Sequence, residues 1–305
     1  MLAYLLKRLT VAVLVALTVS LITFSMIYLS GDPAVALAGE NATEEDIERI
    51  REFYGYDRPI LVQYLDWLAR AVQGDFGQSH YLKKPVAEVI FERLPTTMLL
   101  GLFALLFALT LSIPLGVLAA IRPNSLVDRL ALTIAVVGQA MPSFWFALTL
   151  MLWLGVYWRV LPITGTGSWA NFVMPAIALG YYITPAVMRL TRAGMMEVLA
   201  ADYIRTARAK GLRPMTVLFK HALRNAIIPV VSLAAVQFGF MLGGSIVIET
   251  IFAINGLGFL AWESILRADL PMMQAIVLVL SVFYIVLTFL ADMLNAWLDP
   301  RIRVT

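Results

Sequence analysis

Residues 197–229 read EVLAADYIRTARAKGLRPMTVLFKHALRNAIIP, a basic, alanine-rich segment set between two strongly apolar stretches of the chain. Its composition favours helix, but the helix is interrupted at Gly211 and can restart at Pro214. Glycine commonly ends a helix in the left-handed conformation, and proline suits the first turn of the next helix. The segment therefore predicts two short helices joined by a tight corner, and a polar hairpin of this kind in an apolar chain is a docking surface.

The rest of the chain has the composition of a membrane protein. Of its 305 residues 61% are apolar and 14% are charged, and the mean hydropathy is +0.83. A helix needs roughly 17 to 25 apolar residues to cross the hydrocarbon core of a bilayer. Six uncharged runs have a suitable length, and the long third run can kink at Pro142. The runs are 9–29, 98–121, 130–158, 172–188, 226–248 and 272–291. The sequence thus predicts an all-α integral membrane protein with six transmembrane helices.

Flanking charges predict the orientation of these helices. An even number of spans puts both termini on one side of the membrane, and basic residues mark the cytoplasmic side. The terminal basic residues that place both ends in the cytoplasm are Lys7, Arg8, Arg301 and Arg303. A signal peptide is the alternative for the first run, but its apolar core is too long and no small-residue cleavage pattern follows it.

The chain divides into three regions by composition. Residues 1–30 form the N-terminal tail and the first span, residues 31–95 an extracytoplasmic lid, and residues 96–305 the core transmembrane domain, with the hairpin at 197–224. The lid has twelve acidic and seven basic residues, and Thr43 precedes an acidic first turn, which is typical of a capped helix. We expect the lid to be a small folded unit of short helices.

Several neutral polar residues fall within the predicted spans. Polar groups in hydrocarbon must face a partner or a watery cavity, so these residues are candidates for a translocation path. Hydrogen bonding between packed helices is the competing explanation for each of them. The candidates are Gln139, Ser143, Tyr181, Tyr182, Ser232, Gln237 and Ser245. The ionisable residues Glu249 and Asp292 fall at span ends, where a carboxylate can reach the interface, so no proton relay is predicted.

Sequence patterns for catalysis and for cofactor binding are absent from the chain. No lysine follows a glycine, so there is no phosphate-binding loop, and neither Gly-x-Ser-x-Gly nor His-Glu-x-x-His occurs. There is no cysteine, and the topology puts His80 and His221 on opposite sides of the membrane, which argues against a metal site. We therefore expect no enzyme activity, and any ATP-driven work must come from a partner.

One face of the hairpin repeats small or apolar residues at steps of four, three and four. Its members are Ala200, Ile204, Ala207 and Gly211. Such a face lets another protein approach closely, and Asp202, Arg205 and Arg208 can supply charge-assisted bonds at its edge.

These residues resemble the inner-membrane permease subunits of ATP-binding-cassette (ABC) importers, in the branch for dipeptides, oligopeptides, nickel and glutathione. The likeness is carried by residues 205–211 (RTARAKG) and 221–226 (HALRNA), where the general pattern's glutamate and Leu-Pro ending are replaced in the manner of this branch. It extends over nearly the whole chain through five short motifs. These motifs are Gly31-Asp32-Pro33, residues 74–79, residues 93–96, Pro142-Ser143-Phe144 and Gly256-Leu257-Gly258.

The resemblance implies the fold of a type I ABC importer transmembrane domain and a set of partners. These are a second homologous permease in a heterodimer, two ATPase subunits that bind ATP and Mg²⁺, and an extracytoplasmic substrate-binding protein. It implies that the hairpin is a coupling helix for the ATPase and that transport proceeds by alternating access. The coupling residues are Asp202, Tyr203, Arg205, Thr206, Ala207, Arg208, Ala209, Lys210 and Gly211.

The predicted function is that of a permease subunit in the bacterial inner membrane, carrying peptides or similar small solutes. A self-sufficient secondary transporter or channel is the alternative. The sequence shows neither the inverted repeat nor the charged residue at the midplane that would support this alternative. The alternative also gives the hairpin no function.

Overall fold

The computed structural model describes residues 2–29, 31–39 and 42–298, so Arg301 and Arg303 lie outside the described residues. In these ranges the regular secondary structure is helical, apart from one isolated bridge between Gln78 and Pro85. The elements are α1 (Leu2–Leu29), α2 (Pro33–Ala38), α3 (Glu44–Tyr54), α4 (Ile60–Val72), α5 (Val86–Ile121), α6 (Leu126–Ala140), α7 (Ser143–Leu150), η1 (Met151–Tyr157), η2 (Trp169–Phe172), α8 (Val173–Gly180), α9 (Thr184–Ala200), α10 (Asp202–Ala209), α11 (Pro214–Thr216), η3 (Val217–Leu223), α12 (Arg224–Ala226), α13 (Ile228–Ile251), α14 (Leu257–Leu266) and α15 (Leu270–Leu298).

Six helical segments of the described chain are long and apolar enough to cross a membrane, when each bent pair counts as one span. Four of them are the single helices α1, α5, α13 and α15. The other two are bent pairs: α6 with α7 and η1, bent by 102°, and η2 and α8 with α9, bent by 63°. The predicted number of spans agrees with this count, but two of the six are broken rather than continuous.

Proline accounts for both breaks. Met141 has an extended backbone (φ −77°, ψ 132°) directly before Pro142, as expected for a residue that precedes proline. The kink predicted at Pro142 is therefore present. The second break, at residues 181–183, was not predicted. Pro185 stands in the first turn of α9, where it cannot donate a hydrogen bond back to the preceding turn.

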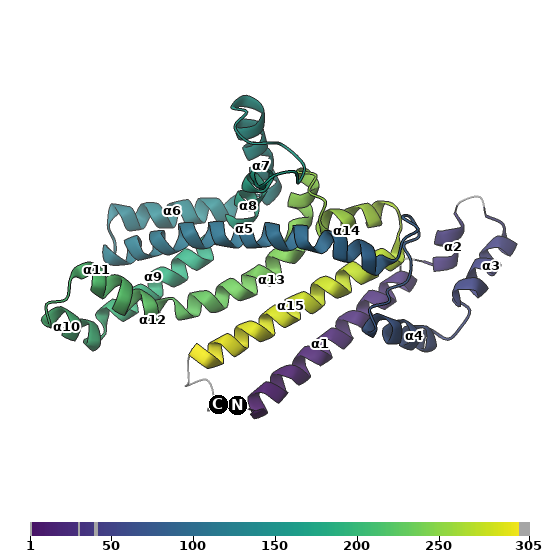
Figure 1. The fold of residues 1–305 in the computed structure, drawn as a ribbon, viewed down its shortest axis with the longest axis horizontal. Coiled ribbons are helices and arrows are strands. Elements are labelled where there is room, and N and C mark those ends of the chain that lie inside the picture. The colour runs from purple at the N-terminus through teal and green to yellow at the C-terminus, as the bar shows by residue number, and fades with distance from the viewer. Residues whose placement is uncertain (1, 30, 40–41, 299–305) are drawn as a thin grey trace.

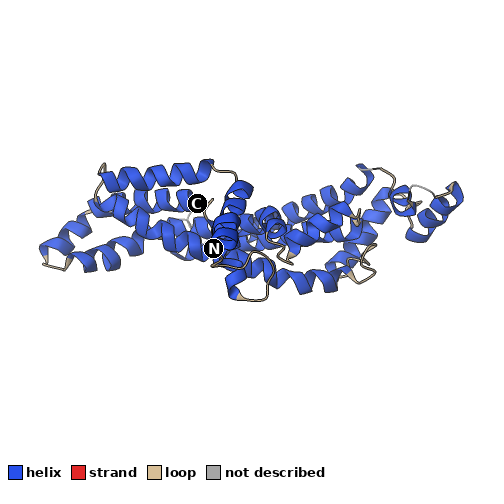
Figure 2. Cartoon of the chain, turned by 90° about the horizontal axis from the view of Figure 1, so that it is seen from above, coloured by secondary structure: helices blue, strands red, loops and turns tan. Residues whose placement is uncertain are grey.

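The helices form an elongated molecule whose two ends are chemically different. Helix α5 runs along its length and packs against α8, α9 and α13, while α13 packs against α15 and α15 against α1 (Figure 1). The lid helices α2, α3 and α4 lie at one end and the hairpin formed by α10 to α12 lies at the other, an arrangement also visible from above (Figure 2). Helix α7 stands away from the layer of long helices.

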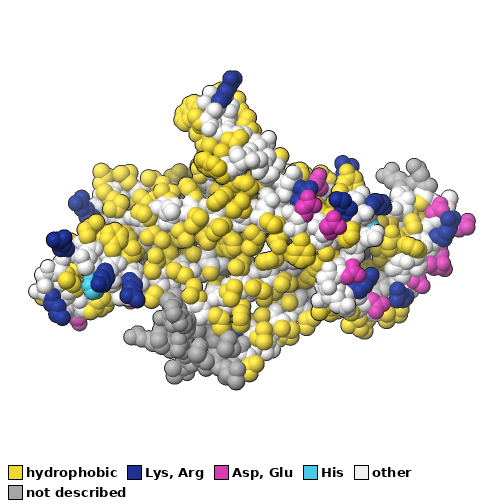
Figure 3. Space-filling model, in the orientation of Figure 1, with side chains coloured by type: hydrophobic (Ala, Val, Ile, Leu, Met, Phe, Trp, Pro, Cys, Tyr) yellow, Lys and Arg dark blue, Asp and Glu magenta, His cyan; other side chains and the backbone are white. Residues whose placement is uncertain are grey.

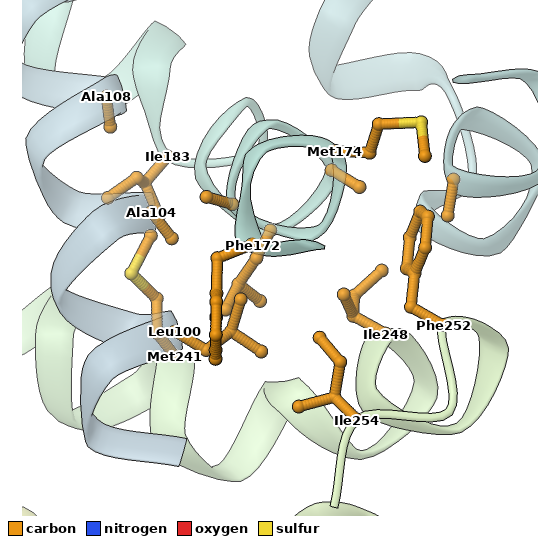
Figure 4. Packing of buried hydrophobic residues seen from close by; sticks show 14 residues of the cluster. Leu100, Ala104, Ala108, Phe172, Met174, Ile183, Met241, Ile248, Phe252 and Ile254 are labelled. Atoms are coloured by element: carbon orange, nitrogen blue, oxygen red, sulfur yellow. The ribbon is translucent and has the colours of Figure 1, made fainter. Parts of the chain in front are cut away.

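Small residues let the long helices approach closely in the centre of the molecule. Leu100, Ala104 and Ala108 of α5 face Ile183, Met241 and Ile248 across a buried cluster (Figure 4). A Cβ atom built on Gly180 would lie 2.4 Å from the Ala104 carbonyl oxygen, so α8 and α5 meet backbone to backbone. Close contact of this kind is what holds helices together in lipid, where apolar burial alone gives no advantage.

The face of the molecule seen in Figure 3 is largely covered by apolar side chains between its two ends. Leu14, Ile134 and Leu148 are 57%, 62% and 50% exposed, for example. Continuous apolar surface of this extent is not found on soluble monomers and marks contact with lipid or with other subunits.

Candidate coupling surface and polar sites

The hairpin has the corner that the sequence predicts. Gly211 has φ +75°, its N–H donates to the Arg208 carbonyl at 3.0 Å, and the next N–H donates to the Ala207 carbonyl at 3.4 Å. This pair of bonds is the Schellman arrangement, which requires a left-handed residue after the helix. Pro214 then occupies the first turn of α11. The predicted helix stop at Gly211 and restart at Pro214 are both confirmed.

Two members of the small-residue face of the hairpin, Ile204 and Ala207, are packed inside the chain, while Ala200 and Gly211 are exposed. Ile204 is fully buried and Ala207 is 7% exposed, in a cluster with Met195, Val217 and Ala222. The expectation that Ile204 and Ala207 offer this face to a partner is therefore wrong. The two residues fasten α10 to the second arm of the hairpin and to the end of α9, and they fix its position relative to the spans.

The opposite face of α10 is the accessible one. The side chains of Asp202 and Arg205 are 92% and 77% exposed, and their ion pair of 3.3 Å is too exposed to contribute much stability. Arg208 and Lys210 are exposed as well, and so is Gly211 at the corner. Positive charge is gathered at this end of the molecule (Figure 3), so the surface suits an acidic groove on a partner. The other coupling residues named above are Tyr203, Thr206 and Ala209, all exposed.

A partly buried ion pair ties the hairpin's supporting helix, α9, to α6. Arg192 Nε and Nη2 each donate to one oxygen of Asp128 at 2.7 Å, and the Asp128 side chain is 2% exposed. Asp128 also accepts from the Asn124 N–H at 2.8 Å. A bidentate pair of this geometry fixes both helices in one register. Ser125, three residues before Asp128, is the capping signal that marks the start of α6.

The polar residues of the bent spans gather where those spans break. The Tyr181 hydroxyl donates to the Met141 carbonyl at 2.6 Å, so the two breaks are bonded to each other. Gln139 is exposed and lies 3.5 Å from Arg189, and Tyr182 is 47% exposed. Ser143 is half-buried.

The three candidates on α13 are divided between surface and interior. Ser232 and Gln237 are half-buried, and Ser232 donates to the Ile228 carbonyl at 3.2 Å. Ser245 is 1% exposed, and its hydroxyl lies within hydrogen-bond distance of two acceptors, the Leu242 carbonyl and the Glu249 carboxylate. Within this chain Ser245 and Tyr181 therefore bond between or along packed helices.

Glu249 does not reach the membrane interface as expected, because its side chain is fully buried. Its carboxylate accepts from the Thr97 and Ser245 hydroxyls, each at 2.8 Å, and from the Phe259 N–H at 2.9 Å. It thus joins α5, α13 and the N-terminus of α14, where a negative charge is favourable. A Cβ on Gly256 would lie 2.4 Å from this carboxylate, so the Gly256 and Gly258 motif serves close packing around Glu249.

Asp292 also has a partner in the chain. Arg8 Nη1 lies 3.0 Å from its carboxylate, which joins α15 to α1. The Asp292 side chain is 20% exposed. No group of three or more potential metal-ligating side chains occurs among the residues that the structure describes.

Asp269 anchors the lid to the core in the same manner. Its buried carboxylate accepts hydrogen bonds from the Ser79 hydroxyl, from the His80 N–H at 3.1 Å and from the Tyr81 N–H at 3.4 Å. Burial lowers the pKa of the neighbouring His80 below its ordinary value, while Asp269 opposes the shift. Neither Asp269 nor Glu249 was singled out from the sequence as a fixed point of the fold.

A cavity of about 860 Å³ lies between the lid and the beginning of α15. Its walls include Tyr54, Tyr56, Trp67, His80 and Gln274. Burial raises the pKa of Tyr56 to about 12, so its phenol stays protonated and can donate a hydrogen bond.

Comparisons with known proteins agree over the whole chain. The family described as binding-protein-dependent transport system inner membrane component matches residues 112–304, and the family for the N-terminal part of such membrane components matches residues 1–101. The glutathione transport system permease protein GsiC of Escherichia coli K12 is 40% identical over 304 residues, covering 99% of each chain. The protein of the same name from Salmonella typhimurium LT2 is 39% identical over the same length, again with 99% coverage of each chain.

The fold is also shared with a solved transporter. A chain of the MetNI methionine ABC transporter in an inward-facing conformation superposes with a TM-score of 0.57 at 18% identity, covering 69% of this chain and 96% of that one. At this identity the likeness concerns the fold alone.

Proposed function

We propose that this chain, which belongs to the family of binding-protein-dependent transport system inner membrane components, forms a translocation path with a second, homologous permease subunit. The chain itself is a permease subunit of an ABC importer. Two ATPase subunits bind and hydrolyse ATP with Mg²⁺, and a substrate-binding protein delivers the solute. The hairpin end faces the cytoplasm and the lid end faces outward. Membership of this family argues against the alternative of a self-sufficient secondary transporter or channel.

The solute is a small peptide or a peptide-like compound such as glutathione. The relatives with 40% identity are glutathione permeases by name, and the alignment spans nearly the full length of both chains. The side chains proposed for the path are themselves neutral, which suits a permissive path, and one of them, Gln139, accepts a hydrogen bond from Arg189. The residues proposed for this path are Gln139, Ser143, Tyr182, Ser232 and Gln237; Tyr181 holds the two breaks together through its bond to Met141.

The exposed basic face of α10 on a buried apolar anchor is the observation that carries the coupling proposal. Arg205, Arg208 and Lys210 project from a helix whose other face is fixed by Ile204 and Ala207. A helix that is docked in an ATPase groove and fastened to its own spans must move with both. Closure of the ATPases therefore moves α10, and α9 carries that motion to the break at residues 181–183.

The test is purification of the tagged chain with its partners in a mild detergent, followed by ATPase assays with the loaded binding protein. The double change Arg205→Glu and Arg208→Glu should abolish stimulated hydrolysis and release the ATPase subunits. Arg129→Glu is the matched control, because Arg129 is an exposed arginine near the same end but outside the hairpin. Stimulated hydrolysis that survives the double charge reversal would refute the coupling role. Uptake into liposomes by the chain alone, without ATP, would refute the importer itself.

A further inference from the structure

Two of the side chains that line the cavity between the lid and α15 have a buried hydrogen-bonding atom without a partner. Gln274 of α15 is 6% exposed and its Nε2 has no hydrogen-bond partner. His80 Nδ1 is also buried without a partner, and both residues line the same cavity. In the described part of the chain only four buried side-chain atoms lack a partner, and two of them are at this one site. Because a buried unpaired amide is costly, a ligand that bonds to it gains that energy.

The cavity has the size and lining of a small-molecule site. Its volume of about 860 Å³ lies in the range that such sites occupy. Tyr54, Tyr56 and Trp67 supply apolar and aromatic walls. Tyr54 packs edge-on against His80 with ring centroids 5.6 Å apart, which holds the imidazole at the wall.

Charges of both signs stand around this lining. Arg58, Arg70 and Lys83 supply positive charge, and Asp66 and Asp75 supply negative charge. Arg58 and Asp66 form an exposed ion pair of 3.1 Å, so either can exchange its partner for a charged group of a ligand at little cost. A carboxylate and an ammonium group of a zwitterion can therefore each find a side chain of opposite charge at this lining.

From these features we infer that the lid carries its own binding site for a short zwitterionic peptide, separate from the path between the spans. A peptide carbonyl accepts a hydrogen bond from Gln274 Nε2, and a second polar group of the backbone bonds to His80 Nδ1. The peptide's termini meet the basic and acidic side chains, and its side chains lie against the aromatic wall. The inference rests on the proposed function for the solute class and for the outward position of the lid.

The test is calorimetric titration of trialanine into the assembled importer in nanodiscs, without the binding protein. The wild type should bind saturably, and Gln274→Leu should weaken binding at least tenfold by removing the amide and keeping the size. Gln73→Leu is the matched control, because Gln73 is a lid glutamine that does not line the cavity and bonds to the Ala69 carbonyl. Lys83→Asn is a second variant; it removes a charge at a position with φ +55°, which asparagine tolerates.

Each outcome has one meaning. The inference would be overturned if the wild type did not bind trialanine. It would also be overturned if the wild type, Gln274→Leu and Lys83→Asn all bound trialanine equally well. Binding of glycerophosphoethanolamine instead of trialanine would assign the cavity to a lipid headgroup and would also overturn it. Stimulated ATPase activity is measured on the same samples. If that activity is intact while trialanine does not bind, only the lid site fails and the proposed function stands.

Discussion

The hairpin end and the lid end of this permease differ in how they place their charges. The hairpin is fastened by apolar contacts, centred on the buried Ile204, and leaves its charged face exposed. The lid pairs its charges within itself: Arg51 binds Asp32 and Glu48, and Arg49 binds Asp46 at 3.1 Å. At the lid end, the buried Asp269 carboxylate adds hydrogen bonds to the apolar contacts that connect the lid to the core. The difference suggests that the hairpin is built to hold a partner and the lid is built to hold its own shape.

The largest effect is expected at the lid end, from Glu249→Ala. The change leaves the Thr97 hydroxyl and the Phe259 N–H without their acceptor, and the Ser245 hydroxyl keeps only the Leu242 carbonyl. Stranding buried donors of this kind should lower the free energy of unfolding by about 3 kcal/mol. Thermal unfolding in detergent would measure it. Glu263→Gln, an exposed position of α14, is the control and should change nothing. A variant as stable as the wild type would show that the carboxylate does not hold the three helices.

Ile204→Ala, in the hairpin, should reduce stability less than Glu249→Ala does. It should reduce the coupling of the chain to ATP hydrolysis more. Ile204 is fully buried against the second arm of the hairpin, so the truncation leaves a cavity and should cost about 2 kcal/mol. The cost is local, so hydrogen exchange should rise in residues 202–209 while the lid is unaffected. Stimulated ATPase activity should fall because α10 is no longer rigid. Ile204→Val retains most of the packing and should retain most of the activity. Increased exchange in the lid would contradict the separation of the two ends.

Sequence reasoning found the spans and the hairpin because their signals are local. Apolar runs, Pro142, Gly211 and Pro214 act on their own segment of chain, and the helices end where those residues predict. It failed where distant segments meet. Whether Ile204 and Ala207 face a partner or the core depends on η3 and α9, which helical periodicity does not reveal.

The buried carboxylates were missed for the same reason. Glu249 is near the end of an apolar run, so its position alone suggested the interface. Its actual neighbour Thr97 is 152 residues away in the chain. Asp269 likewise bonds to a loop 190 residues earlier. Contacts at such separations leave no periodic trace in a single sequence.

The corner of the hairpin gives a third, smaller effect through Gly211→Val. A β-branched side chain at φ +75° is strained, which should cost about 1–2 kcal/mol and displace the arms of the hairpin. No atom would collide with the new Cβ, so backbone strain alone is tested. Gly211→Asn is the matched variant, since asparagine tolerates this conformation and should leave uptake and stimulated ATPase activity close to wild type. Equal activity of the Val and Asn variants would show that the left-handed corner is not needed for coupling.

The smallest effect expected is a pH dependence that belongs to the lid alone. Burial lowers the folded-state pKa of His80 below the unfolded value of 6.5. The stability that comes from holding this imidazole neutral is therefore present above pH 6.5. It is lost as the pH falls from 6.5 towards the folded pKa, because the unfolded state binds the proton first. Hydrogen exchange of residues 77–86 should be measured at pH 5.5 and pH 7.5 and corrected for the intrinsic exchange rate at each pH. The corrected protection of these amides should be lower at pH 5.5. His80→Phe should remove the difference, and His221→Asn in the hairpin should not. If the hairpin variant removed the difference instead, the two ends would not be independent in the way that their packing indicates.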